Sequence, residues 1–290
     1  MALLWAAPLL FFASDAHAWG LQTHLFFAQY ALAFVPLADP DLRAAAARLP
    51  RLVLAGACLP DVAIVGRLAL RTAAFRRAHL WATLRRLAAT PRDERDRALA
   101  LGYATHLLSD VIAHNEFVPE HEARIGRGAM IAHLVSEWAM DRHVGIELQP
   151  ADVLEEAGPY AAQFLARALP CGERLARRAL HILARGDRLL RRSRTPDVCR
   201  AALGVAQPRA GGRFSLYLDR TTRMLSQVEA ALAGVLEDWC GLDPEGSEGD
   251  GGTDARAGEH IARIMQAEYH ARCGGEQRER HQDHSEAGVM

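Results

Sequence analysis

The sequence contains no lysine, and all 34 of its basic residues are arginine. This bias is typical of a GC-rich genome, and we assign it no function. The arginines are balanced by 35 acidic residues, which leaves a formal net charge of -1. A balanced charge provides no global basic field, and it argues against a stable complex with nucleic acid or attachment to an anionic membrane by charge alone.

The chain also lacks runs that alternate between apolar and polar residues, and its aromatic fraction is only 7%. β-branched residues are sparse outside short runs, whereas alanine, leucine and arginine dominate. This composition favours helix nearly everywhere. The fold class that we predict is all-α, with a single multi-helix domain.

Cysteine is scarce, and the five cysteines have scattered spacing: Cys58, Cys171, Cys199, Cys240 and Cys273. An odd count without regular spacing provides no disulfide framework. Pairs Cys171–Cys199 and Cys240–Cys273 are one arrangement among several, so the pairing stays open.

No apolar run approaches the ~20 residues that span a bilayer. The run from Ala2 to Ala13 has the length of a signal-peptide core, and Ala16-His17-Ala18 fits a cleavage site, although no basic residue precedes the run. We expect a signal peptide over residues 1–18, with an uncleaved anchor as the alternative. The mature chain would then have no transmembrane segment and would be exported, either to the periplasm or out of the cell.

The mature chain divides into a globular part, residues 19–240, and a flexible linker and polar tail, residues 241–290. From Gly241 the composition changes to glycine, aspartate, glutamate and serine, which cannot bury enough apolar surface to offset the entropy of ordering. The predicted helices cover residues 22–36, 40–56, 63–90, 92–115, 129–144, 150–169, 172–192 and 215–239, with a loop over 116–127.

Histidines and carboxylates recur at helical spacing in the first half of the chain. His106, Asp110 and His114 follow one another at intervals of four residues, and His133 and Glu137 repeat that interval. Steps of four residues advance ~6 Å and rotate only ~40° along a helix, so each set forms a stripe. Asp141 extends the second stripe, and its position predicts an acid at the helix surface, with orientation of a histidine ligand as the alternative.

Apolar neighbours place both stripes on or beside buried faces. A buried carboxylate is costly unless it is compensated, and metal coordination is one of few ways to compensate it. His24, Asp61 and His79 come from three earlier segments. Taken singly, Asp61 is typical of a helix N-cap and His79 of a surface histidine. Together with the stripes, these nitrogen and oxygen ligands without cysteine indicate a catalytic rather than a structural zinc site.

These residues resemble the ligands of the zinc-dependent phospholipase C family, which shares its helical fold with single-strand-specific zinc nucleases. The matching motifs are Leu59-Pro60-Asp61, His79, Gly102-Tyr103-x-x-His106-x-x-x-Asp110, His114 and His133-x-x-x-Glu137, preceded by Trp19 with His24. They follow the family order over residues 19–137. Beyond about residue 145 we find no further motif.

The resemblance implies three zinc ions. Trp19, through its amine and carbonyl, would bind the first with His24 and Asp110. Asp61, His79 and His106 would bind the second, with Asp110 bridging the two ions. His114, His133 and Glu137 would bind the third. The interval from Asp110 to His114 is shorter than in the family's toxins and nucleases, and His121 is the alternative ligand.

The activity implied is in-line hydrolysis of a phosphodiester, with Asp61 orienting or deprotonating the attacking water. A zinc pair lowers the pKa of a bound water towards ~7. We expect an enzyme of phospholipase C type that acts on phospholipid at a membrane surface. A nuclease, a phospholipase D-type cut and a non-catalytic lipid-binding envelope protein are the alternatives. Headgroup preference, substrate-binding residues and oligomeric state are not predicted.

Overall fold

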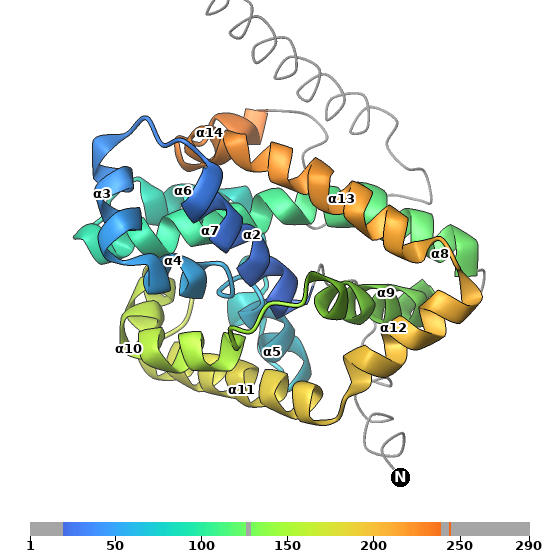
Figure 1. Ribbon diagram of the computed structural model, residues 1–290. Coiled ribbons are helices and arrows are strands. Elements are labelled where there is room, and N and C mark those ends of the chain that lie inside the picture. The colour runs from blue at the N-terminus through green and yellow to red at the C-terminus, as the bar shows by residue number, and fades with distance from the viewer. Residues whose placement is uncertain (1–19, 126–128, 239–243, 245–290) are drawn as a thin grey trace, which may run out of the picture.

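The computed structural model of the protein describes residues 20–125, 129–238 and 244. Within these ranges the chain forms helices and no strand, which confirms the all-α prediction (Figure 1). Trp19, the leader and nearly all of the predicted tail lie outside the described residues. The predicted domain limits therefore stay predictions.

The principal helices follow one another along the chain with short connections. They are α2 (Leu21–Phe34), α3 (Pro40–Arg48), α4 (Pro50–Gly56), α5 (Val62–Leu68), α6 (Trp81–Ala88), α7 (Glu94–Ile112), α8 (Val118–Ile125), α9 (Ala129–Val144), α10 (Pro150–Ala168), α11 (Glu173–Arg192), α12 (Thr195–Ala206), α13 (Ala210–Met224) and α14 (Val228–Leu232).

Helix α7 is the centre of the fold, and most of its side chains are buried. Its start is defined by Asp93, whose carboxylate accepts hydrogen bonds from the backbone N–H groups of Arg95 and Asp96 at 3.0 and 3.1 Å. The helices that pack on it include α2, α3, α4, α6, α13 and α14. Helices α10 and α11 pack side by side as a pair away from α13, and α12 packs on α9 (Figure 1).

Two glycines allow α4 and α7 to approach until their backbones touch. A Cβ atom on Gly102 would lie 1.8 Å from the carbonyl oxygen of Val53, and one on Gly56 would lie 2.2 Å from that of Leu99. No larger residue fits at either position without moving backbone. This close contact brings the end of α4 to the histidine one turn after Gly102.

The predicted helix over 63–90 is wrong, because the chain turns between two short helices. Helix α5 ends at Leu68, and Arg71 adopts a left-handed conformation with φ of 50°. A 3-10 turn, Ala73–Phe75, follows and buries the ring of Phe75 against Gly66. His79 therefore lies in a turn before α6 rather than in the middle of a helix.

The predicted loop over 116–127 is also wrong. Helix α7 continues through a π-helix, Ala113–Phe117, directly into α8. Pro119 is the second residue of α8, directly after the π-helix, and does not end the helix.

Three further boundaries differ from the prediction. Pro50 divides the segment 40–56 into α3 and α4, since proline is disfavoured in a helix interior but suits a helix start. Helix α12 was not predicted, and the segment 215–239 consists of α13 from Ala210, α14 and short 3-10 turns. Among the described helices, none has the length and apolar character needed to cross a bilayer.

The described cysteines Cys58, Cys171 and Cys199 are free, so the pair Cys171–Cys199 is not formed. Burial raises the pKa of Cys58 and raises that of Cys199 to about 11, which keeps both as thiols at neutral pH. Cys240 and Cys273 lie outside the described residues.

We predict that Gly102→Ala destabilises the protein by roughly 3 kcal/mol or more, because the new methyl group meets backbone that cannot move aside. Gly186→Ala is the matched control: that glycine lies in α11 with nothing within 4 Å of an added Cβ atom, and alanine is favoured there by about 0.5–1 kcal/mol. Urea denaturation of both variants measures the difference. Equal stability of the two variants would contradict the close contact.

Candidate metal centre

The carboxylate of Asp110, fully buried in α7, lies between imidazoles on both sides. Its Oδ1 is 3.4 Å from Nε2 of His24, which α2 supplies. Its Oδ2 is 2.9 Å from Nε2 of His106 and 3.7 Å from Nε2 of His79. A carboxylate with one oxygen directed to each side is placed to bridge two metal ions.

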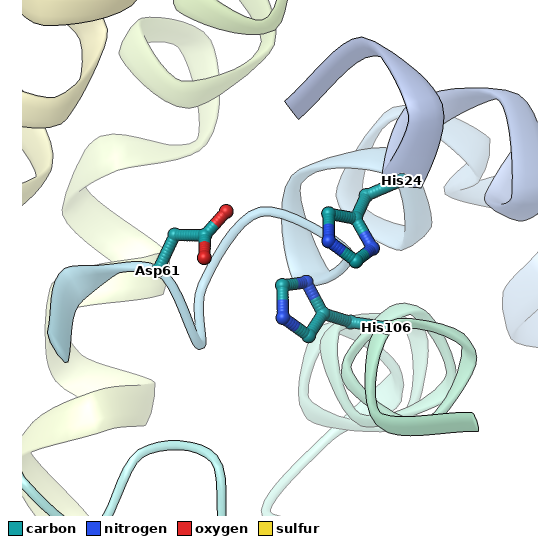
Figure 2. A group of neighbouring side chains, drawn as sticks. All are labelled: His24, Asp61 and His106. Carbon is teal, nitrogen blue, oxygen red and sulfur yellow. The ribbon is translucent and has the colours of Figure 1, made fainter. Parts of the chain in front are cut away.

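Asp61 completes this cluster. It occupies the N-cap position of α5, but its side chain makes no capping hydrogen bond, so the simple N-cap explanation does not hold. Its Oδ1 lies 3.6 Å from Nε2 of His79. Figure 2 shows the side chains of His24, Asp61 and His106 directed toward one another. Two overlapping groups have ligand atoms within 4.8 Å of one another: His24, Asp61 and His106, and His79, His106 and Asp110.

The outer ring nitrogens of His106 and His24 are used in hydrogen bonds that direct Nε2 inward. His106 Nδ1 lies 2.8 Å from the carbonyl oxygen of Ala57, which can only accept, so Nδ1 carries the proton. His24 Nδ1 lies 3.0 Å from the hydroxyl of Ser109, which in turn donates to the carbonyl of His106 at 2.7 Å. The two rings stack with centroids 3.7 Å apart. Metal-ligating histidines are typically fixed in this way.

The nitrogen and oxygen atoms that converge in this cluster are placed to bind a metal ion rather than to form hydrogen bonds with one another. Among the described residues, Nε2 of His79 and His106, Oδ1 of Asp61 and both oxygens of Asp110 are buried and make no hydrogen bond. Buried polar atoms without partners are rare and costly. Nitrogen and oxygen donors that converge without a thiol suit zinc with an open coordination position.

The predicted ligands of the third ion lie on α9 and the π-helix. His133 Nε2 is 2.5 Å from Oε1 of Glu137, and the ring centroids of His114 and His133 are 5.8 Å apart. These three residues do not form a group within metal-ligand distance in the described part of the chain. His114 lies in the π-helix that follows α7, Ala113–Phe117.

His121, the alternative ligand, is buried, and its Nε2 makes no hydrogen bond among the described residues. Its Nδ1 is 2.8 Å from the carbonyl oxygen of Phe117, and its ring contacts those of Phe117 and Phe214. Burial lowers its pKa, and the charges that act on it are those of Glu120, Arg213 and Arg124. None of these charges belongs to the cluster.

Burial dominates the electrostatics of the carboxylates. It raises the pKa of Asp110, an effect that His106 opposes. It raises the pKa of Glu137 to about 8, against the opposing effect of His133 and with a further increase from Asp61 and Asp110. The charge of Asp110 raises the pKa of His106, despite the opposing effect of burial. In the absence of metal the centre therefore holds protons that a cation would displace.

No pattern in the sequence marks Ser109 or the carbonyl of Ala57, which orient the histidines, and Asp141 lies elsewhere than its spacing predicted. The expectation that Asp141 is a surface acid is wrong, since the residue is fully buried. Its carboxylate binds Thr23 at the start of α2 and Arg191 of α11. No periodic signal marks these contacts, because they join segments far apart in the sequence.

Comparison with models of protein families identifies a family domain in this chain. A model of the family described as zinc dependent phospholipase C matches residues 23–163. The chain carries a domain of the zinc-dependent phospholipase C family. Membership implies a phosphoric diester hydrolase, and the matched segment includes all the predicted ligands except Trp19. Comparisons with curated proteins and with solved structures found no match.

We predict that the metal-free protein loses stability as the pH rises from about 5 to 8. Glu137, whose pKa burial raises to about 8 in the folded state, binds more protons in this window than it does in the unfolded state, and the raised pKa of Asp110 acts in the same direction. The free energy of unfolding therefore falls in this window, by up to ~1.4 kcal/mol per pH unit for Glu137.

Zinc should reverse this trend, because its ligands bind in the deprotonated form and its affinity increases with pH. Denaturation curves of the chelator-treated and zinc-loaded protein over this range make the comparison. Identical pH profiles for the two forms would contradict a metal centre at these carboxylates.

Proposed function

We propose that this protein is an exported phospholipase C-type hydrolase that cleaves glycerophospholipids on the glycerol side of the phosphate. Membership of the zinc-dependent family implies both the phosphodiester chemistry and the phospholipid substrate. The leader with its Ala-x-Ala site supports export. We assign residues 19–240 to the catalytic domain, with Trp19 at its start.

The observation that carries the proposal is the placement of Asp110 between His24 and the pair His79 and His106. We assign the first zinc to His24, Asp110 and the terminal amine and carbonyl of Trp19. We assign the second to Asp61, His79, His106 and the same bridging Asp110.

Zinc bound there would supply a Lewis acid that acidifies water and neutralises phosphate charge. The chain itself contributes position and a proton acceptor. The Asp61 carboxylate is almost fully buried, 3.6 Å from Nε2 of His79, and it makes no hydrogen bond within the described residues. We assign to it the orientation of the attacking water and the acceptance of its proton. The hydrogen bonds of His24 and His106 hold their rings against rotation.

The direct test is to incubate the zinc-loaded chain from residue 19 with mixed liposomes and single-stranded RNA together, and to identify the products by mass spectrometry. We expect diacylglycerol and a phosphorylated headgroup. Phosphatidic acid would move the cut to the other phosphate ester, and mononucleotides would make the protein a nuclease. Absence of any product from protein that carries zinc would overturn the proposed activity.

Asp110→Asn is the control for this assay. Because the amide cannot bridge two cations as a carboxylate does, we expect loss of zinc and a fall in kcat/KM of more than about 100-fold, which is the upper range even for residues outside the ligand shell. Full activity with unchanged zinc content would refute the ligand assignment.

The third zinc is assigned to His114, His133 and Glu137. His114 lies beside His133, whereas His121 is surrounded by Phe117 and Phe214. We therefore predict that His114→Ala lowers the zinc content by one ion per chain and that His121→Ala leaves it unchanged. Metal analysis after dialysis measures both variants, and the reverse pattern would make His121 the ligand.

A further inference from the structure

A buried carboxylate on α9, Asp141, lies against the first turn of α2. Its Oδ1 accepts hydrogen bonds from the backbone N–H and the hydroxyl of Thr23 at 2.9 and 2.8 Å. Its Oδ2 accepts one from Nη2 of Arg191, on α11, at 2.8 Å. The carboxylate thereby joins three helices at one point, and its side chain is fully buried.

Helix α2 has no side-chain cap of its own, although the N–H group of Thr23 also donates to the carbonyl oxygen of Gly20 at 2.9 Å. Its N-cap residue is Gly20, and no side chain caps the helix locally. The first N–H groups of a helix require acceptors, and a negative charge there also interacts favourably with the helix dipole. Asp141 provides both from a distant part of the chain.

Gly20 is the residue that makes room for this carboxylate. A Cβ atom at position 20 would lie 2.3 Å from Oδ2 of Asp141. Any side chain there would displace the carboxylate from the start of α2. Gly20 also follows Trp19 directly, the residue whose amine is assigned to the first zinc.

Arg191 compensates the charge of Asp141. Its guanidinium also binds Asp187, one turn earlier on α11, at 2.8 Å. An unpaired buried carboxylate would be strongly destabilising, so Asp141 depends on this arginine. Arg191 lies outside the segment 23–163 that matches the family.

We propose that Asp141, held by Arg191, is a positioning residue for the metal centre. It fixes the first turn of α2, and His24 is the residue directly after Thr23. The position of His24 Nε2 against Asp110 then depends on this contact, which in turn sets the affinity of the first zinc position. The inference rests on the proposed zinc centre and not on the identity of the substrate.

The test compares Asp141→Asn with Asp96→Asn. Asp96 is an equally suitable buried carboxylate: its Oδ2 accepts from the backbone N–H of Arg92 at 2.7 Å and lies 3.0 Å from Nη2 of Arg167. It lies ten residues before His106 on α7, about 15 Å along the helix axis. Comparing the two variants therefore separates the loss of a buried ion pair, which both share, from displacement of His24, which only Asp141→Asn should cause.

We expect both variants to have a lower melting temperature without metal. Only Asp141→Asn should bind one zinc ion about 10- to 100-fold more weakly, the range seen when residues that support metal ligands are lost. Competition with a chromophoric chelator measures the affinity of each ion. Thr23→Val, which keeps the backbone hydrogen bond and loses the hydroxyl, should weaken the same ion by a smaller factor.

The outcomes separate the two proposals. Equal zinc affinity in Asp141→Asn, Asp96→Asn and the unmodified protein would overturn the positioning role and leave the proposed function intact. A zinc-loaded protein that releases no diacylglycerol would overturn the proposed function, while the affinity comparison would still decide the role of Asp141. Uniform loss of every zinc ion in Asp141→Asn would make its role purely structural and overturn the inference.

Discussion

The burial of several ionisable groups at one point constrains the rest of the structure. Asp110 lies at the middle of the fold with no exposed surface, and the inward nitrogens of His79 and His106 converge on it. A cluster of carboxylates and imidazoles in this environment is unstable unless protons or cations neutralise it. The raised pKa values of Asp110 and Glu137 favour the first of these solutions, and zinc, on which the family depends, would provide the second.

The histidines are held by backbone groups that helices leave without partners. Ala57 is the C-cap residue of α4, and the carbonyl oxygen of a C-cap residue has no N–H partner within its own helix. Here that carbonyl accepts from Nδ1 of His106. The contact is possible because Gly56 and Gly102 let α4 touch α7. One close approach of two backbones therefore both satisfies a helix end and fixes a ligand.

The sequence predicted the parts of the molecule that periodicity and residue chemistry encode. The helical fold class, the spacing of His106 and Asp110 and the convergence of His24, Asp61 and His79 on them were all accessible from the sequence. Features that depend on tertiary contacts were not. The turn at Arg71 and the helix over 118–125 arise from packing that overrides a local pattern. The buried contact between Asp141 and Arg191 joins residues 50 apart, so no local motif contains it.

The helices after residue 163 contact the segments that carry the candidate metal centre. Helix α11 supplies Arg191, and α13 supplies Arg220 and Tyr217, which bind Glu116 in the π-helix and Glu120 in α8. These contacts hold the segment in which α7 changes from an α- to a π-helix, at Ala113, shortly after Asp110. A π-turn is intrinsically less favourable than an α-turn and persists where its surroundings stabilise it. The matched family segment contains the candidate ligands that the structure describes, but contacts from the part of the chain after residue 163 help to hold them in place. Truncation at residue 163 would therefore leave the motif intact and remove the charge and packing that support it.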